Sequence, residues 1–360
     1  MPATSSPRSF SKPAALTTGL CLAALTAFAA DKAADKSGSD MSGMDHSQMD
    51  HSGHSMDTTR DAEGRSLYGM KHKMDPAMTK ELREKVALYE NYSDAEITLS
   101  MDMMGPEYAW YISPPDVKGE QGILILMHGF REQGDKIFRQ QVQPMGDIFP
   151  TSMGVGMAMM MSDHIQVALD DLKAAGAKKI AVVPITSSGT NELYRQWLYI
   201  FGKQDTPEFA SVPRVKTDAK LLFVKPPGDD PLVAEVLLDH ANEISKDPKN
   251  EVVIIAGHGP SSAEDNAEEL RVLEGLAKIV KQDGGFADVR GMTLQDDAPP
   301  AIRDANVKKM REVVEAATAT ESHASSSYSA RCSVAARSQV RPGRARAAPA
   351  HASASPSGSS

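Results

Sequence analysis

Short apolar runs alternate with longer segments of helical periodicity in the middle of the chain. Three runs have the length and composition of strands buried on both faces, namely residues 122–127, 179–185 and 251–256. Between the first two, Ile165, Leu169 and Leu172 recur at spacings of four and three, which predicts a helix over 163–175. Strands that alternate with helices of this length predict βαβ units and a parallel sheet.

The same succession of elements occurs twice. The strand at 122–127 runs into His128-Gly129, and the strand at 251–256 runs into Gly257-His258-Gly259. Each junction is followed by a predicted helix, strand and helix. After the first junction these are residues 133–145, 153–161 and 163–175, and after the second they are residues 263–281, 286–294 and 301–317. We therefore expect two related units, over residues 86–215 and 216–318.

The second unit is incomplete in this pattern. The first continues into the strand at 179–185, whereas the second passes into residues 319–360, which are rich in Ser, Ala, Arg and Pro and are predicted to be disordered. A change of reading frame near Ala319 and a natural basic tail are both open explanations. A missing strand would leave an open sheet edge, so a homo-oligomer is one arrangement we consider.

The N-terminus has the features of a secretory signal. Arg8 and Lys12 precede an apolar stretch from 14 to 28, and Ala27-Phe28-Ala29 fits the small-x-small cleavage pattern. We expect residues 1–29 to be a signal peptide and the mature protein to be exported to the periplasm, with a retained anchor as the alternative. No later segment is long and apolar enough to predict stable membrane insertion.

Composition narrows the function classes. The formal net charge is -9, which argues against nucleic acid as a partner. The chain has only Cys21 and Cys332, and cleavage of the signal would leave one, so an intrachain disulfide is not expected. Methionine is frequent, with 20 residues, many of them outside any predicted core.

Many of these methionines lie in residues 30–85, a polar segment predicted to be disordered. It repeats Met-Asp-His-Ser and supplies the candidate metal ligands Met44, His46, Met49, His51, His54 and Met56. Thioethers select Cu(I), and imidazole suits Cu(II). The segment is similar to the Met/His-rich tracts of exported copper-resistance proteins, although chance low complexity is an alternative.

The two strand–His-Gly junctions carry the candidate chemistry of the folded part. A residue at the carboxyl end of a parallel strand faces the crevice where α/β proteins bind ligands. Neutral imidazole there binds a divalent metal ion or accepts a proton. We therefore expect His128 and His258 to be metal ligands and His128 to be catalytic; a histidine hydrogen-bonded within its loop is the structural alternative.

The order of these elements resembles the class II chelatases, which include the sirohydrochlorin cobaltochelatases. The stretches that carry the resemblance are residues 122–131, 174–184, 252–259 and 297–303. The resemblance implies a three-layer αβα fold with a parallel sheet and a truncated second unit. It implies a lyase that inserts Co2+ or Fe2+, as substrate, into a tetrapyrrole without ATP.

Two features of the family are replaced in this sequence. Its strand glutamate falls at Met159 and Gln295, and residues 186–191 lack its second histidine. His164 and Glu192 could substitute, although we expect both on the surface. An exported copper or metal carrier on a catalytically degenerate scaffold is therefore the alternative function. Some aromatic and basic residues could contact a tetrapyrrole, although the ordinary expectation is a core position for the aromatic and a surface position for the basic ones. They are Tyr108, Trp110, Tyr111, Tyr194, Trp197, Tyr199, Lys203, Arg214 and Lys216.

Overall fold

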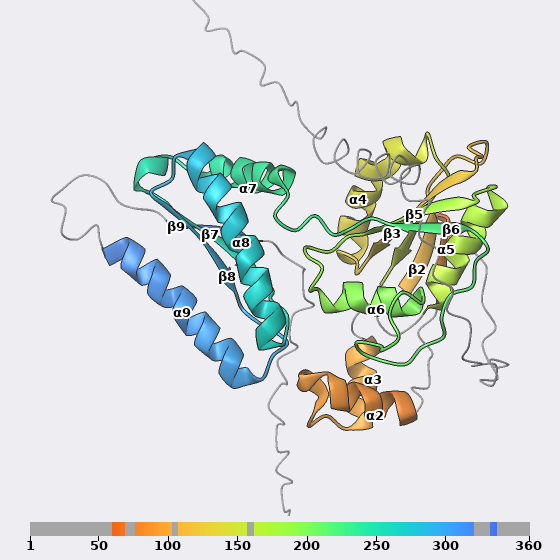
Figure 1. Cartoon of the computed structure of the whole chain (residues 1–360), viewed down its shortest axis with the longest axis horizontal. Helices are drawn as coiled ribbons and strands as arrows, with labels where there is room; N and C mark the ends of the chain where they lie inside the picture. Colours follow the sequence, from red (N-terminus) through yellow and green to blue (C-terminus); the bar gives the residue numbers. More distant parts are fainter. Residues whose placement is uncertain (1–59, 69–75, 103–106, 157–161, 320–331, 337–360) are drawn as a thin grey trace, which may run out of the picture.

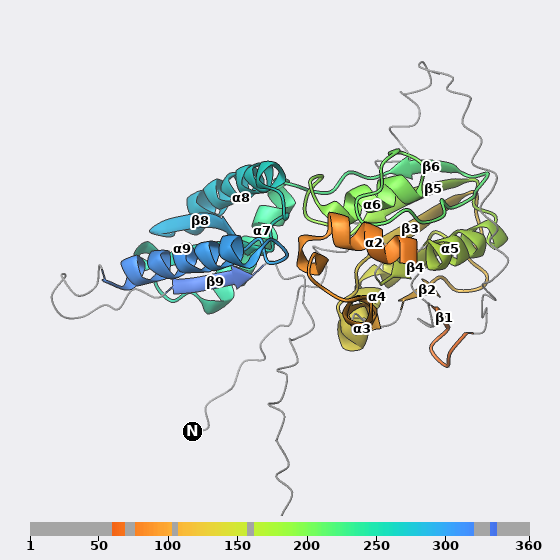
Figure 2. The ribbon, with the colours of Figure 1, turned by 90° about the horizontal axis from the view of Figure 1, so that it is seen from below.

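The computed structural model describes residues 60–68, 76–102, 107–156, 162–319 and 332–336 of the 360-residue chain. These residues form two α/β units that lie side by side in both views (Figures 1 and 2). The predicted signal peptide, the Met/His-rich repeat and Met159 lie outside the described residues.

The first unit is built on a six-stranded sheet of order β1-β2-β4-β3-β5-β6. Strands β3, β4, β5 and β6 are parallel, whereas β2 is antiparallel to β1 and to β4. The strands are β1 (Arg65–Tyr68), β2 (Glu107–Tyr111), β3 (Gln121–Met127), β4 (Thr151–Val155), β5 (Lys179–Pro184) and β6 (Lys220–Phe223). The predicted parallel sheet is confirmed, with two antiparallel strands added at one edge.

Helices cover both faces of this sheet. They are α2 (Pro76–Lys85), α3 (Asp94–Asp102), α4 (Arg131–Gly146), α5 (Asp163–Ala174) and α6 (Glu192–Ile200), with a short 3-10 helix at Ala87–Tyr89. Alternate side chains of β3 enter two different cores. Leu124 and Leu126 pack in the cluster that includes residues of α5 and α6, while Ile123, Ile125 and Met127 pack in the cluster that includes residues of α4. Burial on both faces explains why this strand reads as a continuous apolar run.

The second unit has a smaller sheet of order β8-β7-β9, in which β7 is parallel to both neighbours. Its elements are α7 (Pro231–Ile244), a 3-10 helix at Pro248–Asn250, β7 (Val252–Gly257), α8 (Ala263–Gly284), β8 (Asp288–Thr293), α9 (Pro300–Ala319) and β9 (Cys332–Ala336). Leu237 of α7 and Leu273 and Leu276 of α8 pack on Val253 and Ile255 of β7. Among the described residues, no helix is long and apolar enough to cross a membrane.

The structure differs from the predicted boundaries in three places. Strand β1 and helix α2 fall within residues 30–85, which the sequence predicts to be disordered. Contacts with the first unit order them: Leu82 of α2 is buried in its core, and the Arg65 guanidinium of β1 lies over the rings of Tyr108 and Trp110. Strand β6 falls within 216–318 but pairs with β5 of the first sheet. Strand β9 falls within 319–360 and pairs with β7, where the sequence predicted no strand.

Candidate metal-binding cavity

The two His-Gly junctions meet at one cavity of about 340 Å³. His128 follows β3 of the first unit and His258 follows β7 of the second, and both side chains line the cavity. Three carboxylates line it as well, those of Glu192, Glu269 and Asp297. The structure thus brings together the two histidines that the sequence singled out, from strands in different sheets.

Glycine shapes the turn after each histidine. Gly129 and Gly259 have φ values of 106° and 78°, in the left-handed region where a side chain is strained. A Cβ on Gly259 would also lie 2.8 Å from Cβ of Thr293. The Nδ1 atom of His258 lies 3.1 Å from the Gly259 carbonyl oxygen, and the equivalent distance at His128 is 3.5 Å. A proton on Nδ1 of His258 that is donated to this oxygen leaves Nε2 as a lone-pair donor for a metal ion.

Asp297 connects the two histidines electrostatically. Its Oδ2 atom lies 3.4 Å from Nε2 of His258. Burial lowers the pKa of His128, and the smaller opposing effects come from the Gly129 carbonyl and from Asp135, Asp297 and Glu107. A lowered pKa keeps His128 neutral at neutral pH, which is the form that binds a metal ion.

A buried carboxylate fixes the backbone behind His128. Asp135, 4% exposed, accepts hydrogen bonds from the Tyr108 hydroxyl at 2.8 Å and from the Phe130 backbone N–H at 2.5 Å. Burial, followed by the charge of Asp135, raises the pKa of Tyr108, which therefore stays protonated as a donor. The sequence did not indicate this role, because Asp135 lies in a predicted helix, 133–145, of mostly polar residues.

A second buried pair lies at the carboxyl end of β4. The side chains of Glu107 and His164 are 1% and 0% exposed, and Oε2 of Glu107 lies 3.3 Å from Nδ1 of His164. The expectation that His164 is on the surface is therefore wrong; α5 turns it toward the sheet. Gly156 makes room for the pair, since a Cβ there would lie 2.6 Å from Cγ of Glu107. The 3.3 Å separation is an ion-pair distance without hydrogen-bond geometry, so Glu107 Oε2 and both ring nitrogens of His164 have no hydrogen-bond partner among the described residues.

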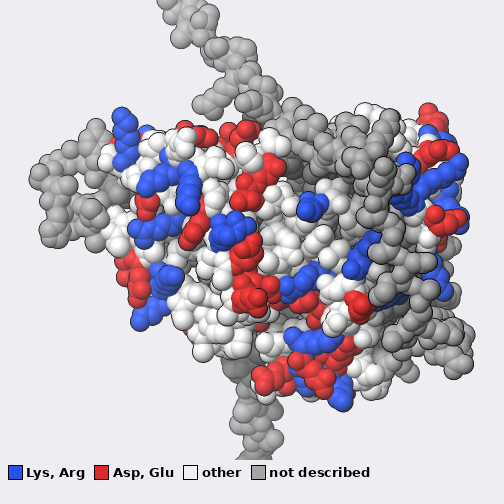
Figure 3. Space-filling model, viewed as in Figure 1, with Lys and Arg blue, Asp and Glu red and all other residues white. Residues whose placement is uncertain are grey.

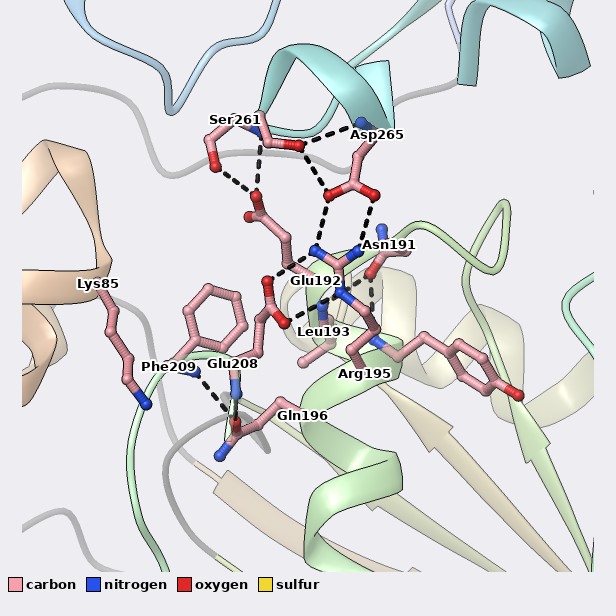
Figure 4. Close-up of polar contacts among 12 residues, drawn as sticks. Lys85, Asn191, Glu192, Leu193, Arg195, Gln196, Glu208, Phe209, Ser261 and Asp265 are labelled. Carbon is pink, nitrogen blue, oxygen red and sulfur yellow. Dashed lines mark hydrogen bonds and ion pairs between the residues drawn. The ribbon is translucent and has the colours of Figure 1, made fainter. Parts of the chain in front are cut away.

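Polar contacts join the two units beside the cavity (Figure 4). Arg195 of α6 donates to both carboxylate oxygens of Asp265 at 2.8 Å and to those of Glu208 at 2.7 and 3.0 Å. Glu192 accepts from the backbone N–H and hydroxyl of Ser261 (Figure 4). Glu192 is half-buried in this contact rather than a surface residue, which corrects the second surface expectation.

Helix caps place these groups. The Asn191 side chain accepts from the backbone N–H groups of Leu193 and Tyr194, so α6 begins at the cavity wall with Glu192 in its first turn. Ser262 accepts from the Asp265 N–H and begins α8 in the same way. Acids in the first turn are favoured by the helix dipole, so both helices present carboxylates at the boundary between the units.

Gln295, which stands where the resemblance to the chelatases places a glutamate, and the cavity residue Glu269 each make hydrogen bonds of their own. Gln295 is buried, and its amide donates to the carbonyls of Pro260 at 3.1 Å and Ser261 at 3.4 Å, which a carboxylate could not do. Glu269 accepts from the hydroxyls of Ser187 and Ser188.

Within the described part of the chain, no three His, Cys, Asp or Glu side chains are already grouped closely enough to hold a metal ion. The other predicted ligands, Met44, His46, Met49, His51, His54 and Met56, lie outside the described residues.

Aromatic and basic candidates are placed elsewhere. Tyr108, Trp110 and Trp197 are buried core residues, whereas Phe130 and Phe209 line the cavity. The basic side chains of Lys203, Arg214 and Lys216 are absent from its lining. No sequence pattern indicated Phe209, because it lies in a loop that only the fold brings to the cavity.

No family model matches the chain, and no curated protein matches it. A solved structure, SirB from Bacillus subtilis with Fe3+, is similar with a TM-score of 0.38 and 18% sequence identity, covering 55% of this chain and 72% of that chain. The class that the fold and cavity define is thus a two-unit α/β protein with mostly parallel sheets. The similarity to SirB extends over about half of it, at low identity.

The lowered pKa of His128 predicts a pH-dependent stability. The unfolded chain binds a proton at His128 near pH 6.5, whereas the folded chain does so only at lower pH, so stability falls as pH drops below about 6.5. Urea unfolding at pH 7.5 and 5.5 should show a smaller loss on acidification for His128→Gln than for wild type. An equal loss in both proteins would contradict the assignment.

Arg195 predicts a coupling between the units. Its side chain and that of Asp265 are 24% and 19% exposed and share paired hydrogen bonds, so a double-mutant cycle with Arg195→Gln and Asp265→Asn should give a coupling of about 1 kcal/mol. The exposed Arg271–Glu268 pair within α8 is the matched control and should give a smaller coupling. Additive effects of the two substitutions would show that this contact does not hold the units together.

Proposed function

We propose that this chain binds a divalent metal ion between His128 and His258 and transfers the ion to a tetrapyrrole. The observation that carries the proposal is that the two histidines, 130 residues apart in the sequence, line one cavity. Asp297 adds a carboxylate 3.4 Å from His258. Imidazole and carboxylate together suit divalent first-row metals, and the ion is here a substrate.

The side chains support both halves of such a reaction. A neutral His128, favoured by burial, has a lone pair for the ion. Insertion releases the N–H protons of the macrocycle, and Asp297 is a carboxylate at the cavity that can accept one of them. The apolar side chains of Phe130, Leu193 and Phe209 in the same lining supply contact for a planar ring.

The proposal predicts that both histidines contribute to metal affinity. His128→Ala and His258→Ala in the full chain should each weaken Co2+ binding by about tenfold or more, because each removes one ligand. His240→Ala is the control, since His240 is an exposed residue of α7 that does not line the cavity. Any ions held by the N-terminal Met/His-rich segment are common to all four proteins and cancel in the comparison.

Insertion is followed in the same proteins. Sirohydrochlorin with Co2+ or Fe2+ should change its absorbance with wild type and His240→Ala, and at a much lower rate with His128→Ala. Unchanged Co2+ affinity in both cavity variants would refute the metal site. Metal binding that depends on the histidines without any insertion would leave a metal carrier and refute the chelatase reaction.

A second candidate function rests on the sequence repeat at 41–57. We propose that the chain is exported to the periplasm and that this segment binds copper through the thioethers of Met44, Met49 and Met56, with flexible geometry and modest selectivity. The segment would then carry a metal-binding activity that does not depend on the cavity.

This candidate predicts that exchange of the three methionines for leucine weakens Cu(I) binding in competition with a chelator, while leaving the Co2+ affinity of the cavity unchanged. Met310→Leu on α9 is the matched control, because it removes a thioether outside the segment. Equal Cu(I) retention by the triple variant and the control would refute copper binding by these methionines.

A further inference from the structure

Two basic residues without a partner follow parallel strands of the first sheet. Arg131 comes four residues after the end of β3, and Lys225 comes two residues after the end of β6. Both residues are exposed, and neither forms a hydrogen bond, ion pair or ring contact with another described residue. Strands β3, β5 and β6 are consecutive and parallel in the sheet, so the residues that follow them lie along one edge, where the cavity also lies.

Apolar side chains connect the two basic residues to the cavity. Phe130 and Ile185 line the cavity, and both pack, as Val224 does, against the cluster that includes residues of β3 and α4. We call these three side chains the apolar wall. Arg131 directly follows Phe130 in the chain, and Lys225 directly follows Val224. Each basic residue therefore adjoins a member of the apolar wall.

The chain after β6 runs beside the loop that lines the cavity. The Val224 backbone N–H donates to the Val182 carbonyl at 2.9 Å, and the Gly228 N–H donates to the Ser187 carbonyl at 2.9 Å. Ser187 is itself a lining residue. These two hydrogen bonds bracket Lys225 and hold it close to the cavity.

The backbone at Arg131 is strained. Its φ of 61° lies in the left-handed region, which is costly for a residue with a side chain. The buried Asp135 carboxylate fixes the preceding residue by accepting from the Phe130 N–H at 2.5 Å. A strained backbone that carries an exposed cation beside a cavity is typical of a ligand-binding position.

Acidic residues close to these two basic residues in sequence have partners of their own. Glu132 pairs with Lys136 at 3.0 Å. Asp229 pairs with Arg271 at 3.7 Å. On the face shown in Figure 3, most basic side chains likewise lie beside acidic ones. The two unpaired cations beside the apolar wall are therefore available to a ligand.

The carboxylates of the lining belong to other elements. Glu192 on α6 and Glu269 on α8 accept from serine hydroxyls. Asp297, which follows β8, lies 3.4 Å from Nε2 of His258. These negative groups suit a metal ion, whereas the basic residues beside the apolar wall suit the acidic edge of an organic ligand.

We infer that Arg131 and Lys225 bind peripheral carboxylates of the tetrapyrrole while its apolar ring lies on Phe130 and Ile185. This inference rests on the proposed function and specifies its substrate class as a carboxylated macrocycle. The Arg131 guanidinium can hold a carboxylate through two parallel hydrogen bonds, and the Lys225 ammonium adds a compact charge on a flexible stem. Ring contact supplies the apolar part of the binding.

Titration with two metal-free porphyrins of opposite charge tests the inference. The tetracarboxylate coproporphyrin and the tetracationic tetra(N-methylpyridyl)porphyrin are added to the full chain at low salt and followed by fluorescence. Arg131→Gln and Lys225→Gln should each weaken coproporphyrin binding by about threefold, and the double variant by about tenfold, because an exposed charge pair contributes modestly. The cationic porphyrin should bind these variants at least as tightly as it binds wild type, because a repulsive charge is removed.

Matched variants separate a local charge from a change in net charge or fold. Arg311→Gln and Lys309→Gln remove exposed cations of α9 that do not line the cavity, and they should leave both affinities unchanged. Arg131→Gly suits the left-handed φ and should weaken coproporphyrin binding as Arg131→Gln does, with a urea unfolding midpoint no lower than that of wild type. High salt should shrink the differences among all these proteins, because it screens the charges.

The outcomes distinguish this inference from the proposed function. Coproporphyrin affinity that Arg131→Gln and Lys225→Gln leave unchanged, or equal weakening of both porphyrins, overturns the inference even if the cavity histidines prove to bind Co2+. Weaker coproporphyrin binding without weaker binding of the cationic porphyrin supports it even if Co2+ affinity does not depend on the histidines. If wild type binds neither porphyrin, the inference is overturned, while the Co2+ titration still decides the metal site.

Discussion

Burial of β3 on both faces is the constraint on which the site depends. Leu124 and Leu126 are committed to one core and Ile123, Ile125 and Met127 to the other, so the strand cannot slip by a residue without exposing a complete set of apolar side chains. The strand is therefore fixed in register, and His128 emerges at its carboxyl end. Strand β7 fixes His258 by the same means, with Val253 and Ile255 held under α7 and α8.

The cavity exists because the two units meet through polar groups. In the part of the chain that the structure describes, no hydrophobic cluster contains residues of both units. Arg195, Glu192 and Glu269 instead make hydrogen bonds from one unit to the other. An apolar boundary would have closed on itself to native packing density. The Arg195–Asp265 ion pair and the hydrogen bonds of Glu192 and Glu269 to serines instead join the units beside the cavity, and Glu192 and Glu269 also line it.

The repeated strand–His-Gly pattern was enough to predict strands β3, β4, β5, β7 and β8, helices α4, α5, α8 and α9 and the two histidines, because buried strands and amphipathic helices leave strong local periodicities. The parallel strands β6 and β9 were not predicted. The strands β1 and β2 left a weaker signal, since both are short; β1 pairs with β2, and β2 pairs with β4. His164, Glu107 and Phe209 could not be placed from the sequence, because their environments arise from contacts between distant segments.

The number of ligands at the cavity bears on whether the metal ion stays or leaves. Structural zinc sites use about four protein ligands in a closed shell. Here the two histidines and Asp297 line an open cavity, and no group of three ligands is already assembled among the described residues. For the proposed site we therefore expect a lower metal affinity than that of a closed four-ligand site, because the lining groups would have to move, or water or the acceptor would have to complete the shell. A protein that passes its ion to another molecule requires that weakness, since a saturated shell would retain the cargo.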